Sequence, residues 1–123
     1  MKGKVLIVDD SALARRTMRQ ILEGAGYVVA EADDGLNALE RYFLEKPDIV
    51  MLDLVMKGMY GLDVLTKLRE LDPDVKVIVV SADIQTSSHD LVQEAGGAGF
   101  VNKPFDRNDI LSAIDVALAG GAA

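Results

Sequence analysis

The sequence predicts an α/β domain in which a doubly wound parallel sheet of five strands carries five helices. Short uninterrupted apolar runs alternate with longer segments whose apolar residues recur every three or four positions. Uninterrupted runs of Val, Ile and Leu are typical of parallel strands, because such strands are buried on both faces. Alternation of strand and helix along the chain favours a parallel sheet with right-handed crossovers and helices on both faces.

Five apolar runs are the candidate strands. They cover residues 5–8, 27–30, 49–52, 75–80 and 100–101, and the last is the shortest. Residues that favour turns precede three of them: Gly24 and Gly26 before the second run, Pro47 before the third, and Pro73 before the fourth. The strands are therefore expected to end near positions 8, 30, 52, 80 and 101.

The segments between the runs each carry an apolar stripe at helical spacing. The four clear stripes are Ala14, Met18, Ile21 and Leu22; Leu36, Leu39, Tyr42 and Phe43; Leu62, Leu65 and Leu68; and Ile110, Leu111, Ile114, Ala117 and Leu118. Residues 84–95 are the weakest helical segment, since only Leu91, Val92 and Ala95 form a stripe there. Asp106, followed three residues later by Asp109, is typical of a capped helix start.

Length, charge and composition exclude several classes of function. The 123 residues are enough for one hydrophobic core, so we expect a single domain over residues 1–123. Thirteen basic and twenty acidic residues give a formal net charge of -7, which argues against direct DNA binding. The chain has no cysteine and one histidine, His89, which excludes disulfides and His-rich zinc sites. No apolar run approaches the ~18 residues of a membrane span and no signal peptide is evident, so we expect a cytoplasmic protein.

Polar residues follow four of the five predicted strands. Asp9 and Asp10 follow the first, Asp53 the third, Ser81 the fourth and Lys103 the fifth. In a doubly wound sheet these strand ends share one edge, where ligands bind. Three carboxylates in one place raise a carboxyl pKa or require a cation. Oxygen ligands without histidine or cysteine favour a hard cation, Mg²⁺ or Mn²⁺, which keeps coordination positions open for phosphate oxygens.

Each of these residues also has a structural explanation when it is taken alone. Asp9 and Asp10 can cap a helix, Asp53 can begin a turn, and Ser81 can be an ordinary loop hydroxyl. Their joint appearance at the ends of different strands favours a shared site. Lys103 would meet a phosphoryl oxygen there as a point charge.

The motifs at these strand ends resemble a known family. Val5-Leu-Ile-Val-Asp-Asp10, Asp53-Leu-Val-Met56, Gly61, Ser81-Ala82 and Phe100-Val-Asn-Lys-Pro-Phe105 are similar to those of the receiver domain of two-component response regulators. The resemblance covers about residues 4–118 and is nearest to the CheY-like single-domain type, which has no output domain. It implies a flavodoxin-like fold with the strand order 2-1-3-4-5, the order for which CheY itself serves as an example.

The resemblance implies a role for each matching residue. Asp53 would accept a phosphoryl group from the phosphohistidine of a sensor histidine kinase. Asp10, Asp53 and the backbone carbonyl of Val55 would bind Mg²⁺, and Asp9 would hold a metal-bound water. Lys103 would contact the phosphoryl group, and the peptide bond that follows it resembles the family's cis peptide.

The resemblance also implies a switch and a set of partners. Ser81 would move to hydrogen-bond the phosphoryl group while Phe100 turns inward. A downstream target would then bind the face formed by the helix at 84–95, the fifth strand and the last helix. The chain would not be an enzyme beyond its own phosphorylation and dephosphorylation, would not bind a membrane, and would be a monomer or a weak, phosphorylation-dependent dimer.

Four alternatives remain open, and one of them, a degenerate receiver that only binds protein, is opposed by the intact set of acids. A phosphorelay intermediate would pass the phosphoryl group to a histidine phosphotransfer protein. A Mg²⁺-dependent aspartyl phosphatase usually has an acid two residues after its nucleophile, where this chain has Val55. A flavin or nucleotide carrier would need a glycine-rich loop after the first strand, where this chain has Asp9, Asp10 and Ser11.

Four positions bear on how the switch is tuned. Lys57 stands where the family usually has proline, and its charge is expected to affect kinase docking. Gly97 stands where the family usually has alanine, which is expected to loosen the switch region. Val55 and Asp83 occupy positions that tune phosphoryl hydrolysis in the family.

Overall fold

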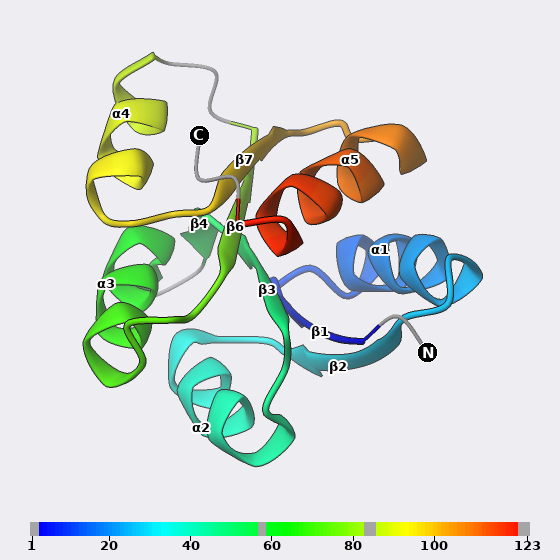
Figure 1. The fold of residues 1–123 in the computed structure, drawn as a ribbon, viewed down its shortest axis with the longest axis horizontal. Helices are drawn as coiled ribbons and strands as arrows, with labels where there is room; N and C mark the ends of the chain where they lie inside the picture. Colours follow the sequence, from blue (N-terminus) through cyan, green and yellow to red (C-terminus); the bar gives the residue numbers. More distant parts are fainter. Residues whose placement is uncertain (1–2, 57–58, 83–85, 121–123) are drawn as a thin grey trace.

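A computed structural model describes residues 3–56, 59–82 and 86–120 (Figure 1). Its main sheet has five strands: β1 (Lys4–Val8), β2 (Val28–Ala32), β3 (Ile49–Asp53), β6 (Val77–Ser81) and β7 (Gly99–Asn102). The strands are parallel and lie in the order β2-β1-β3-β6-β7. Because β6 and β7 are the fourth and fifth strands of this sheet, the predicted order 2-1-3-4-5 is confirmed. Lys57 and Asp83 lie outside the described residues.

In the part of the chain that the structure describes, five helices cover the two faces of the sheet. They are α1 (Ala12–Gly24), α2 (Gly35–Glu45), α3 (Gly61–Leu71), α4 (Thr86–Glu94) and α5 (Arg107–Leu118). In Figure 1, α1 and α5 lie on one side of the sheet and α2, α3 and α4 on the other. The predicted start of the last helix is confirmed, since Asp106 and Asp109 form a reciprocal capping box. No helix in the described part of the chain is both long and apolar enough to pass through a membrane.

Alternate residues of the central strands build two separate cores. Leu6, Val8, Val50, Leu52, Val77 and Val79 pack with residues of α2, α3 and α4. Val5, Ile7, Ile49, Met51, Ile78 and Val80 pack with residues of α1 and α5. Because both faces of β1, β3 and β6 are buried, these strands are the uninterrupted apolar runs seen in the sequence.

Two strands differ from the prediction by two residues at one end, and the other three differ by at most one residue at each end. The second strand starts at Val28 and ends at Ala32, because the amide of Tyr27 donates to Leu22 O in the turn after α1. The fourth starts at Val77, because the amide of Val75 donates to Asp72 O in the turn after α3.

A short antiparallel hairpin lies between β3 and α3. It consists of β4 (Val55–Met56) and β5 (Met59–Tyr60), and the sequence did not predict it. Strands of two residues are too short to show the alternation on which such a prediction depends. Leu54 alone separates Asp53 from this hairpin, so the hairpin begins beside the strand-end region.

Candidate functional site

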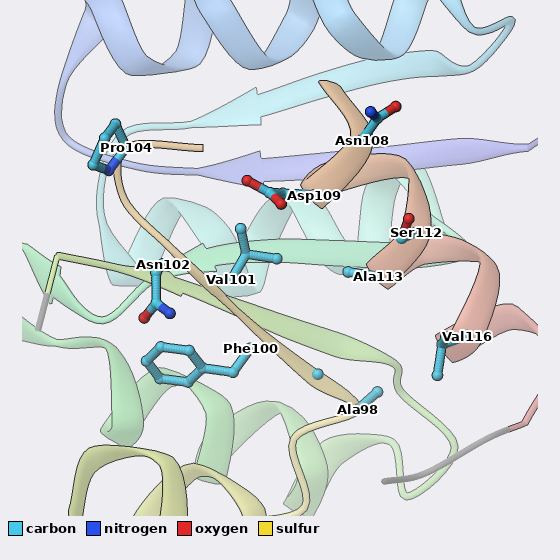
Figure 2. Close-up of a pocket in the computed structure, with 11 residues that line it drawn as sticks. Ala98, Phe100, Val101, Asn102, Pro104, Asn108, Asp109, Ser112, Ala113 and Val116 are labelled. Atoms are coloured by element: carbon cyan, nitrogen blue, oxygen red, sulfur yellow. The ribbon is translucent and has the colours of Figure 1, made fainter. Parts of the chain in front are cut away.

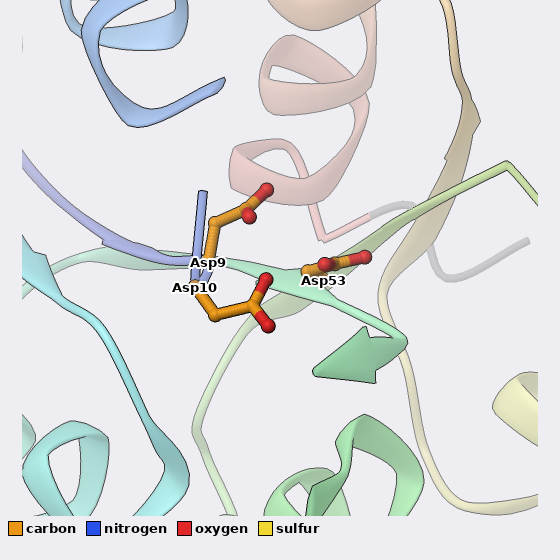
Figure 3. A group of neighbouring side chains, drawn as sticks. All are labelled: Asp9, Asp10 and Asp53. Atoms are coloured by element: carbon orange, nitrogen blue, oxygen red, sulfur yellow. The ribbon is translucent and has the colours of Figure 1, made fainter. Parts of the chain in front are cut away.

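Three aspartates meet where β1 and β3 end (Figure 3). These strands are neighbours, with Val8 beside Leu52, so the next residue of each is an aspartate at the same level. One carboxylate oxygen from each of Asp9, Asp10 and Asp53 lies within 4.8 Å of the others. Asp9 and Asp53 are 4% and 7% exposed, whereas Asp10 is open to solvent. The sequence-predicted convergence of these three carboxylates is therefore present.

Lys103 brings a positive charge to the same place from the segment after β7. Its Nζ lies 3.1 Å from Asp9 Oδ2 and 3.7 Å from Asp53 Oδ1. The amide of Lys103 donates to Ser81 O at 2.7 Å, which continues the pairing of β7 with β6 beyond the strand ends. The lysine therefore reaches past the end of β6 to the acids on β1 and β3. Its charge offsets one of three carboxylates.

Asp9 is held by several contacts besides Lys103. Its Oδ1 accepts a hydrogen bond from the amide of Ser11 at 2.9 Å. Its own amide donates to Ala32 O at 3.2 Å. The guanidinium of Arg15 donates to its backbone oxygen at 2.7 Å. Sequence reasoning did not single out Arg15, because nothing in the pattern of α1 distinguishes it from Arg16 beside it.

The environment of Asp53 makes its ionisation less favourable than that of an ordinary aspartate. Burial, followed by repulsion from Asp9, raises its pKa from 3.8 to about 6. The charge of Lys103 and the amide of Val55, which is 3.4 Å from Asp53 Oδ1, act in the opposite direction. A divalent cation would relieve this repulsion, and the all-oxygen donor set fits Mg²⁺ or Mn²⁺. Asp9, Asp10 and Asp53 are the side chains that would hold it.

Ser81 and Phe100 lie on one face of the sheet, toward α3 and α4. Ser81 is the last residue of β6 and is 1% exposed. Phe100 is paired in register with Val79, which is two residues before Ser81 and faces the same core. Phe100 is half-buried against that core, at one side of a groove of about 510 Å³ between β7 and α5 (Figure 2). The two predicted switch residues are thus on adjacent strands and the same face.

Gly61 allows α3 to begin directly against the segment that follows Asp53. A Cβ atom on Gly61 would lie 2.8 Å from Leu54 Cα and 2.9 Å from Leu54 O, closer than such atoms approach. The amide of Gly61 also donates to Leu54 O at 2.6 Å. The sequence included this glycine in a motif, and the structure supplies its physical reason.

Gly97 is also closely packed. A Cβ atom there would lie 2.5 Å from Val92 Cγ1 of α4 and 3.1 Å from Val92 O. The glycine therefore permits a contact that alanine would disturb, and its effect on the switch stays a prediction. The Lys103–Pro104 peptide bond is cis, as the resemblance implied.

Comparison with known proteins agrees with this arrangement. The sequence model of the response regulator receiver domain matches residues 5–115. Chemotaxis protein CheY of Thermotoga maritima is 40% identical over 116 residues, which is 94% of this chain and 97% of that protein. Sporulation initiation phosphotransferase F of Bacillus subtilis is 33% identical over 117 residues, with 93% of this chain and 92% of that protein covered.

Solved structures have the same fold. A two-component response regulator of the LuxR family from Aurantimonas sp. SI85-9A1 superposes with a TM-score of 0.94 at 30% identity, covering 100% of this chain and 89% of that chain. A CheY-like receiver domain protein from Methanospirillum hungatei JF-1 superposes with a TM-score of 0.89 at 28% identity, covering 96% and 94%.

Proposed function

This chain belongs to the response regulator receiver domain family, and on that premise we propose that Asp53 accepts a phosphoryl group from the phosphohistidine of a sensor histidine kinase. The observation that carries the proposal is the position of the Asp53 carboxylate. This carboxylate is buried, and one of its oxygens lies within 4.8 Å of an oxygen of Asp9 and an oxygen of Asp10. Its Oδ1 lies 3.7 Å from Lys103 Nζ. An acid with these neighbours is suited to phosphoryl transfer, in which protein groups chiefly position and neutralise charge.

The transfer is a displacement at phosphorus. An ionised Asp53 oxygen forms the new P–O bond, the P–N bond to the kinase imidazole breaks, and its electron pair stays on the imidazole nitrogen. Asp10, Asp53 and the Val55 carbonyl would hold a Mg²⁺ ion, Asp9 would hold a metal-bound water, and the ion would supply positive charge to the phosphoryl oxygens. Lys103 contacts another of these oxygens. Besides its own phosphorylation and dephosphorylation, the domain catalyses no reaction.

Phosphorylation gives Ser81 and Lys103 a new partner. It adds about -1.5 to -2 charge and three acceptor oxygens beside Asp53. The Ser81 hydroxyl moves to donate to one of them, and Phe100 turns inward into the space that Ser81 leaves. Because β7 and α5 line the groove next to Phe100 (Figure 2), this change alters the face of α4, β7 and α5. A downstream protein target distinguishes the two forms at that face.

A second candidate function is a phosphorelay intermediate. Its support is the similarity to sporulation initiation phosphotransferase F, which extends over 93% of this chain. Such an intermediate passes the phosphoryl group from Asp53 to a histidine phosphotransfer protein. The test mixes the phosphorylated chain with a purified phosphotransfer domain. Transfer of the phosphoryl group to that domain, at a rate faster than hydrolysis without the domain, would favour the relay over a target-binding switch.

Covalent labelling tests the phosphoacceptor. The chain is incubated with acetyl phosphate and Mg²⁺, and its intact mass is measured. We expect one phosphoryl group on the wild-type chain and none on Asp53→Asn or after chelation of the metal. Asp63→Asn is the matched control, since Asp63 is an exposed aspartate in the first turn of α3. Stoichiometric labelling of Asp53→Asn would exclude Asp53 as the acceptor.

Amide chemical shifts test the switch. Beryllofluoride, which mimics an acyl phosphate, is added with Mg²⁺ to the isotope-labelled chain. We expect shifts of amides near Asp53 and also along β7 and α5. Shifts confined to the residues after β1 and β3 would contradict a change at the α4, β7 and α5 face.

A further inference from the structure

We propose that Arg15 is a positioning residue for the divalent-cation site: its guanidinium fixes the peptide that joins Asp9 to Asp10 and thereby sets the metal affinity. The inference rests on the proposed function, because it concerns the same site. It adds a residue of α1 that touches neither the cation nor the phosphoryl group.

The guanidinium of Arg15 bridges two elements. Its Nη1 donates to the backbone oxygen of Asp9 at 2.7 Å, and its Nε donates to Glu31 Oε1 of β2 at 2.9 Å. The side chain of Arg15 is only 18% exposed and that of Glu31 29%. Arginine suits this place because its planar group holds several donors in a fixed arrangement. The guanidinium therefore ties the end of β1 to β2.

The bridge acts on the site through the backbone oxygen of Asp9. That oxygen belongs to the peptide plane whose other end is the amide of Asp10. The remaining polar groups of Asp9 are held separately, by Ala32 O, by the amide of Ser11 and by Lys103. The Arg15 bond therefore restrains rotation of the plane leading to Asp10.

Asp10 is the acid that depends most on this restraint. It is exposed, whereas Asp9 and Asp53 are buried by the surrounding residues. Because its side chain is exposed, the direction of its Cα–Cβ bond strongly influences whether its carboxylate stays near Asp53. The orientation of the Asp9–Asp10 peptide fixes that direction.

Arg15 is itself held in place by Glu31 of β2. Glu31 is paired in register with Ile7, whose side chain faces the core under α1, so Glu31 also points toward this helix. Its second oxygen accepts from Arg19 Nε at 2.6 Å. Although burial acts to raise the pKa of Glu31, the hydrogen bonds from Arg19 and Arg15 lower it overall. Glu31 is therefore ionised at neutral pH and keeps the Arg15 guanidinium in place.

A purely structural ion pair between α1 and β2 would behave differently. Its loss would lower the free energy of unfolding but leave the metal affinity of the folded chain unchanged. The loss of charge alone would strengthen Mg²⁺ binding, because three carboxylates attract a cation more strongly when a nearby positive charge has been removed. A weaker metal affinity after loss of Arg15 therefore has the orientation of the peptide as its cause.

The test compares Arg15→Met with Arg16→Met. Methionine keeps an apolar stem of similar length, and both variants remove one positive charge from α1. Arg16 is the matched control, since its side chain is exposed. Mg²⁺ affinity of the unphosphorylated chain is measured by calorimetry, and hydrogen exchange of the Asp10 and Ser11 amides is measured without metal. The wild type is tested for Mg²⁺ binding and Asp53 labelling in parallel.

We expect Arg15→Met to bind Mg²⁺ about tenfold more weakly, the effect usual for a partner of a metal ligand. The Mg²⁺ concentration for half-maximal labelling should rise by a similar factor, and the two amides should exchange faster. Arg16→Met should match the wild type. Wild-type Mg²⁺ affinity in Arg15→Met, or an equal loss in Arg16→Met, would overturn the inference while the labelling of wild-type Asp53 stands.

Two further variants cover the case in which Arg15→Met does not fold. Arg15→Lys keeps a charge that can meet only one of the two acceptors, and Glu31→Gln removes the anchoring charge. Both should bind Mg²⁺ more weakly than the wild type, and wild-type affinity in both would overturn the inference. Failure of the wild type to bind Mg²⁺ or to label Asp53 would instead count against the proposed function.

Discussion

At Asp53, burial beside Asp9 raises the pKa to about 6, against an ordinary value of 3.8. The folded chain therefore keeps this proton to a higher pH than the unfolded chain does. The corresponding stability is fully present below pH ~4 and is lost as the pH rises through ~6. Asp53→Asn removes this dependence, because its amide does not ionise.

Asp53→Asn should therefore be more stable than the wild type at neutral pH without metal. At 1.36 kcal/mol per pKa unit, we expect its free energy of unfolding to exceed that of the wild type by up to about 3 kcal/mol at pH ~7 and by little at pH ~4. Urea unfolding in the presence of a chelator measures both differences. A difference that does not change with pH would contradict the pKa of Asp53.

The Lys103 side chain contributes charge to the same pocket, so its removal has two separable effects. Lys103→Met leaves all three carboxylates, and Mg²⁺ binding should persist. Because Lys103 lowers the pKa of Asp53, the pH midpoint of labelling by acetyl phosphate should move upward. The labelling rate at saturating Mg²⁺ should fall by roughly a hundredfold, as for loss of one charge-stabilising donor.

The control for this variant is Lys67→Met. Lys67 pairs with Glu70 on α3, and the two side chains are 56% and 61% exposed. This substitution should leave the rate and the pH midpoint unchanged. An unaltered labelling rate in Lys103→Met would remove Lys103 from the transfer step.

Among the elements, α3 depends on one glycine for its contact with the segment after β3. Gly61→Ala places a methyl group against the backbone of Leu54, which cannot move aside as a side chain would. We expect a loss of about 1–3 kcal/mol in the free energy of unfolding, the usual cost of overpacking. Mg²⁺ affinity should also fall, because Leu54 directly follows Asp53.

Gly99→Ala, in β7, is the matched control for the Gly61→Ala substitution. A Cβ atom on Gly99 would lie 3.6 Å from Ile78 Cγ1, an ordinary contact distance. Urea unfolding and calorimetry on both variants give the comparison. Equal effects of the two substitutions on stability and on Mg²⁺ affinity would mean that the close approach of Gly61 to Leu54 does not cause the losses in Gly61→Ala.

The strands also show which parts of the fold the sequence pattern predicts and which parts it does not. The central strands β1 and β3 were predicted because both of their faces are buried, which leaves an uninterrupted apolar run. The range predicted for the edge strand β2 begins one residue and ends two residues too early, since only its last residue, Ala32, is fully buried. The hairpin of β4 and β5 has too few residues for any period, so its position depends on tertiary contacts.

For the whole molecule, the strand order determines which site residues can be predicted. Once the sheet is parallel, Asp9, Asp53 and Ser81 must share one edge, and the sequence is sufficient to place them there. The contact of Lys103 with Asp9 spans 94 positions of sequence and depends on how β7 ends beside β6. The bridge from Arg15 to the Asp9 backbone oxygen and to Glu31 likewise requires α1 to pack against β2, so no local pattern predicts it.

The same topology links metal binding to the stability of the whole chain. The acids of β1 and β3 are brought together only by folding, so Mg²⁺ binds the folded chain and not the unfolded one. At a Mg²⁺ concentration of 100 times its dissociation constant, we expect the free energy of unfolding to rise by about 2.7 kcal/mol. The thermal midpoint with excess MgCl₂ and with a chelator measures this rise.

Two controls separate binding from screening of the net charge of -7. Sodium chloride at the same ionic strength should give only a small increase, because it screens charges without occupying the site. Asp10→Ala should fold, since Asp10 is exposed, but should lose the specific effect of Mg²⁺. Asp115→Ala, at an exposed position of α5, should keep it. If Mg²⁺ stabilises Asp10→Ala as much as the wild type, or no more than sodium chloride does, the stabilisation comes from charge screening and the three aspartates do not form a cation site.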